Sequence, residues 1–212
     1  SSQWATWAPQ FERAISLVGY PLAAGYPEKR MAWHLIQYFA AEAGVVVPGV
    51  VSLQIKRPAR PVGAPDGPYV TLQTRAGWSK YKEWSGWEDV AARLAAKGVP
   101  IVRIDESAGR TLAESIALVA NAKVHLGIDS FANHLTNYTW VDADGIGRKV
   151  HAVIVWGSTQ WTASGYRHNE NVSLALPCQP CFRENPAISR MDRGPCVNPP
   201  RESYDDPTPP AC

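Results

Sequence analysis

The chain has 212 residues, of which 45% are hydrophobic and 19% are charged, and its formal net charge is +2. This length and composition predict a globular protein with one ordinary core, or with one domain and an appendage. Lysine and arginine are scattered along the sequence, and with so small a net charge we expect no nucleic-acid partner. No apolar run approaches the roughly 20 residues that a membrane-spanning helix needs, so we expect no membrane span.

The N-terminal part predicts an arm that leads into a single helix. Its first 27 residues are aromatic and are interrupted by prolines, without a sustained period. From Pro27 to Gly44, apolar residues recur at helical spacing, at Met31, Leu35, Tyr38 and Phe39. A short strand is expected at Val50–Ile55, and the proline-rich stretch Lys56–Pro68 is expected to be a linker or an exposed loop.

Beyond that loop, predicted strands alternate with predicted helices, which is typical of an α/β protein with a parallel sheet. Ser85 with Glu88 and Thr111 with Glu114 have the spacing of capping boxes, so we expect a helix to begin at each serine or threonine. The expected order is strand Tyr69–Thr74, helix Ser85–Lys97, strand Val99–Ile104, helix Thr111–Asn121, strand Lys123–Ile128, a helix after Ser130, and strand Val150–Trp156.

Polar residues follow the ends of the predicted strands. Right-handed crossovers bring the carboxyl ends of parallel strands to one edge of the sheet, where ligands bind in open α/β folds. Asp129 and Ser130 end one strand and begin a helix that carries His134, and Lys82 lies after another strand. Such a mixture of cations, carboxylates and hydroxyls suits a ligand that bears both phosphate and hydroxyl groups. The edge also collects Thr74, Arg75, Asp105, Glu106 and the segment 157–159.

Several short motifs lie along the predicted strands and helices. They are Gln73-Thr74-Arg75 with Lys82-Glu83-Trp84, Leu112-Ala113-Glu114-Ser115-Ile116-Ala117, Gly127-Ile128-Asp129-Ser130 with His134-Leu135, and Val155-Trp156-Gly157-Ser158-Thr159. Together they resemble the heptosyltransferase family of GT-B glycosyltransferases, over roughly residues 27 to 185. A further run, Gly165-Tyr166-Arg167-His168-Asn169, leads into Cys178-Gln179-Pro180-Cys181 and is most similar to the bacterial autotransporter heptosyltransferase branch.

The resemblance implies the C-terminal, donor-binding half of a two-domain bacterial, cytoplasmic enzyme. The expected parts are an arm and helix (1–55), a Rossmann-like nucleotide-sugar-binding domain (56–176) and an irregular Cys/Pro-rich tail (177–212). The donor would be a nucleotide-diphosphate sugar such as ADP-heptose, and the acceptor a hydroxyl of a protein or lipopolysaccharide. The resemblance places Thr74 and Lys82 on the donor phosphates, Asp129, Ser130 and His134 around the sugar-diphosphate, and Glu106 near the nucleoside.

Two departures from the family pattern are visible. Phe131 stands where the family commonly has a small residue after the Asp-Ser/Thr pair, and the loop between Arg75 and Lys82 is longer than usual. No Rossmann glycine fingerprint occurs, and residues 1–55 are too few for the N-terminal domain that carries the acceptor site and the base. The sequence therefore leaves two possibilities: a donor half that works with another domain or chain, or a domain that has lost catalysis.

Plainer interpretations stay open for each candidate residue. Asp129 could be only a helix N-cap, and Lys82 only a solvated lysine. His134 could be an ordinary core or surface histidine, and Asp105 and Glu106 loop carboxylates. Three functions remain. The first is the donor half of a glycosyltransferase, which would be inactive as this chain alone and would need no metal on the diphosphate. The second is a non-catalytic binding or assembly module in which Phe131 closes the old pocket, and the third is a protein-interaction domain built on the tail.

The tail holds all four cysteines, at Cys178, Cys181, Cys196 and Cys212. Two cysteines separated by two residues can coordinate one metal ion, and four thiolates suit a tetrahedral zinc or iron site. Disulfides are the alternative for an even number of cysteines in a proline-rich segment. The resemblance points to a structural metal, because autotransporter heptosyltransferases carry a cysteine-ligated iron in a comparable extension.

Overall fold

The structure is a computed structural model. It describes residues 35–47, 49–50, 52–76, 82–105, 108–157, 159 and 161–173. Glu106, the four cysteines of the tail, the expected N-terminal arm and the start of the helix predicted from Pro27 lie outside the described residues. Within the described part, no helix is both long and apolar enough to cross a membrane.

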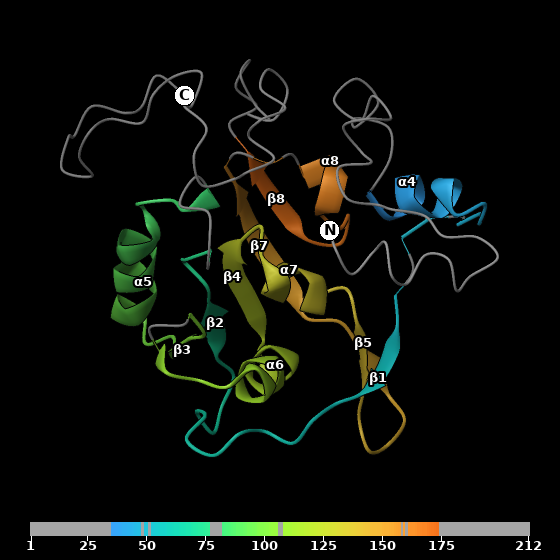
Figure 1. The fold of residues 1–212 in the computed structure, drawn as a ribbon. Helices are drawn as coiled ribbons and strands as arrows, with labels where there is room; N and C mark the ends of the chain where they lie inside the picture. Colours follow the sequence, from blue (N-terminus) through green and yellow to red (C-terminus); the bar gives the residue numbers. More distant parts are fainter. Residues whose placement is uncertain are drawn as a thin grey trace.

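A five-stranded parallel sheet forms the centre of the molecule (Figure 1). Its strand order is β3-β2-β4-β7-β8, and every neighbouring pair is parallel. The predicted α/β, Rossmann-like class is therefore confirmed. The strands are β2 (Val70–Leu72), β3 (Ile101–Arg103), β4 (Val124–Ile128), β7 (His151–Trp156) and β8 (Glu170–Ser173).

Helices cover both faces of this sheet. Helix α5 (Trp87–Ala96) packs against a cluster that includes β2 and β4. Helices α6 (Leu112–Asn121) and α7 (Phe131–Leu135) pack in a second cluster with β3. Ile101 joins the first cluster and its neighbour Val102 the second, and consecutive residues of a strand point to opposite faces. The two clusters therefore lie on opposite faces of the sheet.

The two predicted capping boxes had different outcomes. Thr111 caps α6 as predicted: its hydroxyl accepts from the backbone N–H of Glu114, and the Glu114 carboxylate accepts from the backbone N–H of Thr111. The box at Ser85 is wrong. Helix α5 has Gly86 at its N-cap and no side-chain cap, because the burial of Trp87 sets where the helix begins. The Glu88 carboxylate does not reach back to the N-cap and instead forms an ion pair with Arg103, with Oε2 and Nη2 2.6 Å apart.

A smaller sheet and two further helices complete the described part. Strands β1 (Gln54–Lys56), β5 (Thr139–Val141) and β6 (Gly147–Arg148) form a sheet of order β1-β5-β6, in which β1 overlaps the predicted strand only at its end. Helix α4 (Leu35–Glu42) lies within the helix predicted from Pro27 to Gly44. The short helix α8 (Trp161–Ser164) and the strands β5, β6 and β8 were not predicted.

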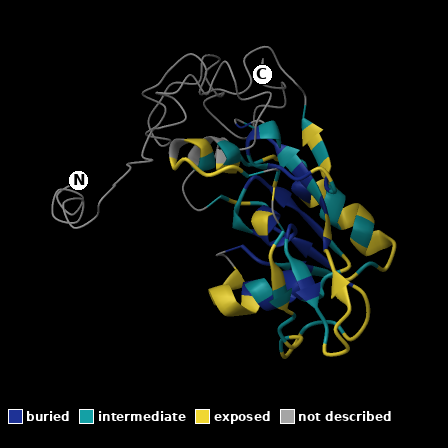
Figure 2. Ribbon diagram, turned by 90° about the vertical axis from the view of Figure 1, so that its right-hand side faces the viewer, coloured by how far each residue is buried: buried dark blue, intermediate teal, exposed yellow. Residues whose placement is uncertain are grey.

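Buried residues follow the middle of the five-stranded sheet, whereas the outer face of α5 and the turn between β5 and β6 are exposed (Figure 2). Gln73, Asp105 and Asp129 are buried polar residues that lie at or just after the carboxyl ends of β2, β3 and β4. Since polar groups are seldom buried without partners, this edge of the sheet is where a site has to be sought.

Candidate functional site

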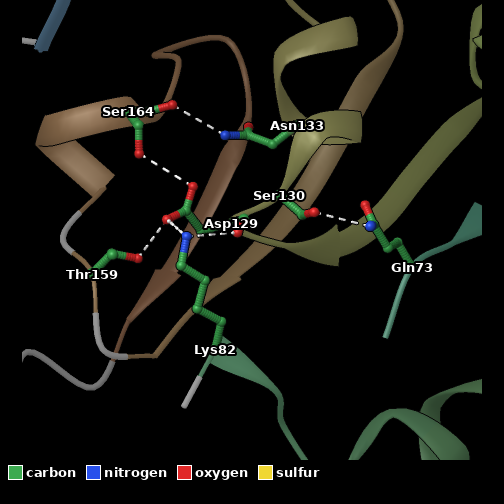
Figure 3. Close-up of polar contacts among 7 residues, drawn as sticks. All are labelled: Gln73, Lys82, Asp129, Ser130, Asn133, Thr159 and Ser164. Atoms are coloured by element: carbon green, nitrogen blue, oxygen red, sulfur yellow. Dashed lines mark hydrogen bonds and ion pairs between the residues drawn. The ribbon is translucent and has the colours of Figure 1, made fainter. Parts of the chain in front are cut away.

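The carboxylate of Asp129 is the centre of the polar cluster at the carboxyl end of β4 (Figure 3). It is 5% exposed and accepts three hydrogen bonds. Lys82 Nζ and Thr159 Oγ1 donate to Oδ2 at 2.8 and 2.7 Å, and Ser164 Oγ donates to Oδ1 at 3.2 Å. One buried negative charge therefore holds side chains from three separate segments of the chain.

Lys82 approaches this carboxylate from the segment before α5. Its ammonium group also donates to the backbone oxygen of Asp129 at 3.1 Å, and its side chain is only 16% exposed. An ammonium group has three N–H donors. Two of them are used by Asp129, and the third has no partner among the residues that the structure describes. Lys82 is therefore fixed in place and still able to donate to an anion.

Ser130 and Gln73 form the neighbouring pair. The Ser130 hydroxyl accepts from Gln73 Nε2 at 3.0 Å instead of capping α7, where Ser130 is the N-cap residue. Gln73 Oε1 is buried and has no hydrogen-bond partner within the described segments. An acceptor left unpaired in this way is unusual and commonly marks a place for water or a ligand donor.

Thr74 has a structural partner of its own. The buried carboxylate of Asp105 accepts from Thr74 N at 2.8 Å, from Thr74 Oγ1 at 3.0 Å and from Arg75 N at 3.0 Å. Asp105 thus shapes the loop after β2, as expected for a loop carboxylate. The Thr74 hydroxyl hydrogen is used in this contact, so only its oxygen lone pairs are left for a ligand that donates hydrogen bonds.

His134 lies on α7 in a partly buried position, and its Nδ1 is 2.8 Å from the hydroxyl of buried Tyr166. Burial of the ring lowers the pKa of His134, nearby Lys82 lowers that pKa further, and Asp129 opposes both. These opposing influences place His134 within electrostatic reach of the Lys82–Asp129 pair. Burial, with Tyr138 and Asp129 nearby, raises the pKa of Tyr166 to about 12.

The segment that carries Ser164 and Tyr166 is tied to α7 by polar side chains. Asn133 Nδ2 donates to the backbone oxygen of Ser164 at 3.1 Å, and Asn169 Nδ2 donates to Thr136 Oγ1 at 2.8 Å. Gly165 is packed so closely that a Cβ would lie 2.5 Å from the backbone oxygen of Trp161. The partners of Asp129 and His134 are therefore held rigidly.

Helix α7 itself contributes little charge to the site. It has five residues, so few peptide dipoles add up at its N-terminus. Phe131, at its first position, packs against the cluster on the α6 and α7 face of the sheet. The fixed positive charge of the described site therefore comes mainly from Lys82.

The structure brings together Lys82, Asp129 and Ser130, as the sequence predicted. His134 joins them through Tyr166 and electrostatics, whereas Thr74 lies on Asp105. Sequence reasoning gave no role to Gln73, Ser164 or Tyr166. The motif that begins at Gly165 was the only signal near the last two, and nothing local marks Ser164 as a partner of a residue 35 positions away.

The described residues contain no group of three or more histidine, cysteine or acidic side chains placed to hold a metal ion. The predicted cysteine site lies in the tail, outside the described residues.

Comparison with solved structures identifies the same architecture in TibC, a bacterial iron-containing dodecameric glycosyltransferase from enterotoxigenic E. coli H10407. The two chains share 18% sequence identity with a TM-score of 0.54. The likeness shows that the two chains share a fold. The match covers 74% of this chain and 43% of the TibC chain, so this chain spans less than half of that protein's length. No family model matches the sequence, and no curated protein matches it.

Proposed function

We propose that this chain binds a nucleotide-diphosphate sugar, with ADP-heptose as the first candidate, and serves as the donor half of a glycosyltransferase. The observation that carries the proposal is the Lys82 ammonium group, fixed on buried Asp129 at the carboxyl edge of a fold shared with a glycosyltransferase. Ligands of open α/β folds bind at this edge.

In this proposal Lys82 binds the diphosphate and acts again during transfer. The bond between the anomeric carbon and the phosphate oxygen breaks, and the leaving diphosphate keeps the electron pair. A cation held in advance beside that oxygen stabilises the developing negative charge, which is where preorganised groups help most. Asp129 keeps Lys82 in position, and the hydroxyl-bearing side chains around it supply contacts for the sugar.

The acceptor hydroxyl and the base that deprotonates it are proposed to come from a further domain or a partner chain. The acceptor would be a hydroxyl of a protein or of lipopolysaccharide, in line with the family resemblance. A donor domain alone does not align a nucleophile with the anomeric carbon. We therefore expect the purified 212-residue chain to show no sugar transfer with ADP-heptose and hydroxyl acceptors. Turnover by this chain alone would mean that it carries the base.

A second candidate is a non-catalytic binding or assembly module, and one observation favours it. The polar side chains of the site already pair with one another: Lys82 with Asp129, Ser130 with Gln73, and Thr74 with Asp105. A phosphate has to compete with Asp129 for Lys82. If that competition fails, the same contacts serve only to hold the fold together.

Calorimetric titration separates the two candidates. ADP-heptose, ADP-glucose and UDP-glucose are titrated into the 212-residue chain and into the variants Lys82→Ala and His134→Ala. Because a hydrogen bond to a charged group contributes about 1.5–3 kcal/mol, Lys82→Ala should weaken donor binding about 10- to 100-fold. Lys123→Ala is the matched control, since it removes an exposed lysine just before β4, at the opposite edge of the sheet. Unchanged donor affinity in both site variants rejects the assignment.

The tail is proposed to hold a structural zinc or iron ion on Cys178, Cys181, Cys196 and Cys212. The support is the Cys-x-x-Cys spacing, the family resemblance and the iron-containing description of TibC. Elemental analysis of protein purified under reducing conditions should find about one equivalent of zinc plus iron, as expected for one four-thiolate site. A protein without metal and without free thiols would have disulfides in the tail instead.

A further inference from the structure

We infer that Tyr166 is a positioning residue that fixes the tautomer of His134, by donating its phenol hydrogen to Nδ1 and so leaving the ring's own hydrogen on Nε2. The inference rests on the proposed function in one respect: it assigns that Nε2–H group to an oxygen of the donor diphosphate. The geometry of the pair stands without it.

The two rings are held in one arrangement. Tyr166 Oη and His134 Nδ1 are 2.8 Å apart, the ring centroids are 5.9 Å apart and the ring planes meet at 87°. The backbone oxygen of Tyr166 accepts from Asn169 N and from Asn171 Nδ2, both at 3.0 Å. Tyr166 is 8% exposed, whereas His134 is exposed. The phenol is therefore the fixed partner and the imidazole the accessible one.

Chemistry decides which of the two groups donates. A neutral imidazole has one N–H donor and one nitrogen acceptor. That nitrogen is a far stronger base than a phenol oxygen, so the hydrogen bond is most stable as O–H donating to N. The pKa of His134 is lowered, chiefly by burial of the ring, and that of Tyr166 is raised to about 12, so both groups are neutral at pH 7.

Burial is the largest influence on the pKa of His134 and lowers it, while the two nearby charges oppose each other: Asp129 raises this pKa and Lys82 lowers it. Burial, Tyr138 and Asp129 all raise the pKa of the Tyr166 phenol and so keep it protonated. The neighbouring ring of His168 lies 6.0 Å from Tyr166, and burial lowers the pKa of His168 as well. A neutral Nε2–H within electrostatic reach of Lys82 can donate to a phosphate oxygen, whereas the other tautomer would present a lone pair and repel that oxygen.

Nuclear magnetic resonance tests the tautomer without any ligand. In the 212-residue chain labelled with 15N-histidine, long-range proton–nitrogen spectra at pH 7 distinguish a protonated ring nitrogen from an unprotonated one. His134→Ala identifies the signals of His134 among those of the five histidines. We expect an unprotonated Nδ1 and a protonated Nε2, and in Tyr166→Phe a mixture of both tautomers. A protonated Nδ1 in the unmodified chain, or an unchanged tautomer in Tyr166→Phe, overturns the inference.

Titration with ADP-heptose tests what the tautomer does. Losing one neutral hydrogen bond typically costs a factor of about three to ten, so Tyr166→Phe should weaken binding by about that much. The same substitution in a His134→Ala background should have no further effect, and equal effects in both backgrounds overturn the inference. Tyr69→Phe is the matched control, because it removes one phenol hydrogen bond, to the Leu118 backbone oxygen, just before β2 and so at the opposite edge of the sheet. If the unmodified chain binds no donor sugar, the proposed function fails, while the spectra still decide the role of Tyr166.

Discussion

The five-stranded sheet packs differently on its two faces. Against α5, apolar side chains of β2 and β4, such as Leu72 and Ile128, meet Trp87. On the face covered by α6 and α7, the same two strands carry polar side chains. Thr71 and His125 are fully buried there, with Thr71 Oγ1 3.1 Å from His125 Nδ1. The α5 face is therefore apolar across β2 and β4. The other face, called the polar face below, combines the apolar cluster around Val102 and Leu118 with a buried hydrogen-bonded pair.

The polar face leads toward the candidate site. Side chains alternate along a strand, so Gln73 follows Thr71 on the same face of β2, and Gly127 follows His125 on β4. A Cβ at Gly127 would lie 2.6 Å from His125 Nε2. Both Gln73 Oε1 and His125 Nε2 are buried without partners among the described residues. Unpaired buried polar atoms are costly, and Gln73 brings one of them to the site through its hydrogen bond with Ser130.

The largest loss of stability is expected from Asp129→Ala. This change leaves the Lys82 ammonium group partly buried without its counter-charge, which should lower the free energy of unfolding by about 3 kcal/mol. Urea unfolding at pH 7 measures it. The double variant Asp129→Ala/Lys82→Met removes the orphaned charge and should recover part of the loss. A loss below about 1 kcal/mol in Asp129→Ala would mean that the pair is no more than a surface ion pair.

Gly165→Ala should come next, because it breaks the attachment between α8 and β8. The new Cβ would lie 2.5 Å from the Trp161 backbone oxygen and 2.9 Å from Asn171 Oδ1, so atoms on both sides have to move. We expect the free energy of unfolding to fall by about 2–3 kcal/mol. Gly67→Ala is the control, since a Cβ there meets nothing within 4 Å. Equal urea concentrations at the midpoint of unfolding for the two variants would contradict the close packing seen at Gly165.

The polar face should also make stability depend on pH through His125. Burial lowers the pKa of this histidine from 6.5 to about 3, so the folded protein keeps it neutral while the unfolded chain takes up a proton. The contribution of His125 to the free energy of unfolding is complete above about pH 6.5 and is lost as the pH falls toward 3. Between pH 7 and pH 5 the free energy of unfolding should therefore fall by about 2 kcal/mol.

The test is to unfold the unmodified chain and His125→Gln in urea at both pH values. The variant should lose about 2 kcal/mol less on acidification than the unmodified chain does. His134 and His168 titrate in both proteins, so their effects cancel in the difference. An equal pH dependence in the two proteins would show that His125 takes up its proton in the folded state.

The smallest effect is expected on the apolar face. Ile128→Val removes one methylene group from a fully buried side chain packed against the α5 face, at a cost of about 1 kcal/mol. The affinity for ADP-heptose and the pH dependence should not change, since no polar contact is lost. A donor affinity that falls as far in Ile128→Val as in Lys82→Ala would mean that the two faces are not separate in function.

Sequence patterns were most reliable where the decisive contacts are local. The strands β2, β3, β4 and β7 were predicted because each is a short apolar run between turn residues, and the Thr111 box forms among residues three positions apart. The Ser85 box has the same local chemistry and fails, because a buried tryptophan two residues later outweighs one cap. The local sequence of β5, β6 and β8 does not predict a strand as clearly. Whether these short segments form strands depends on which partner strand lies next to them.

The sequence by itself determined the alternation of strands and helices, and with it the edge at which Lys82, Asp129 and Ser130 would lie. Only the tertiary structure decided how those residues pair. Lys82 is 47 positions from Asp129 and Ser164 is 35, so their distances depend on loop paths and on the register of neighbouring strands. The pairing of Tyr166 with His134 likewise depends on how the segment before β8 packs on α7. Local propensity places each residue on its element, and long-range packing places it against its partner.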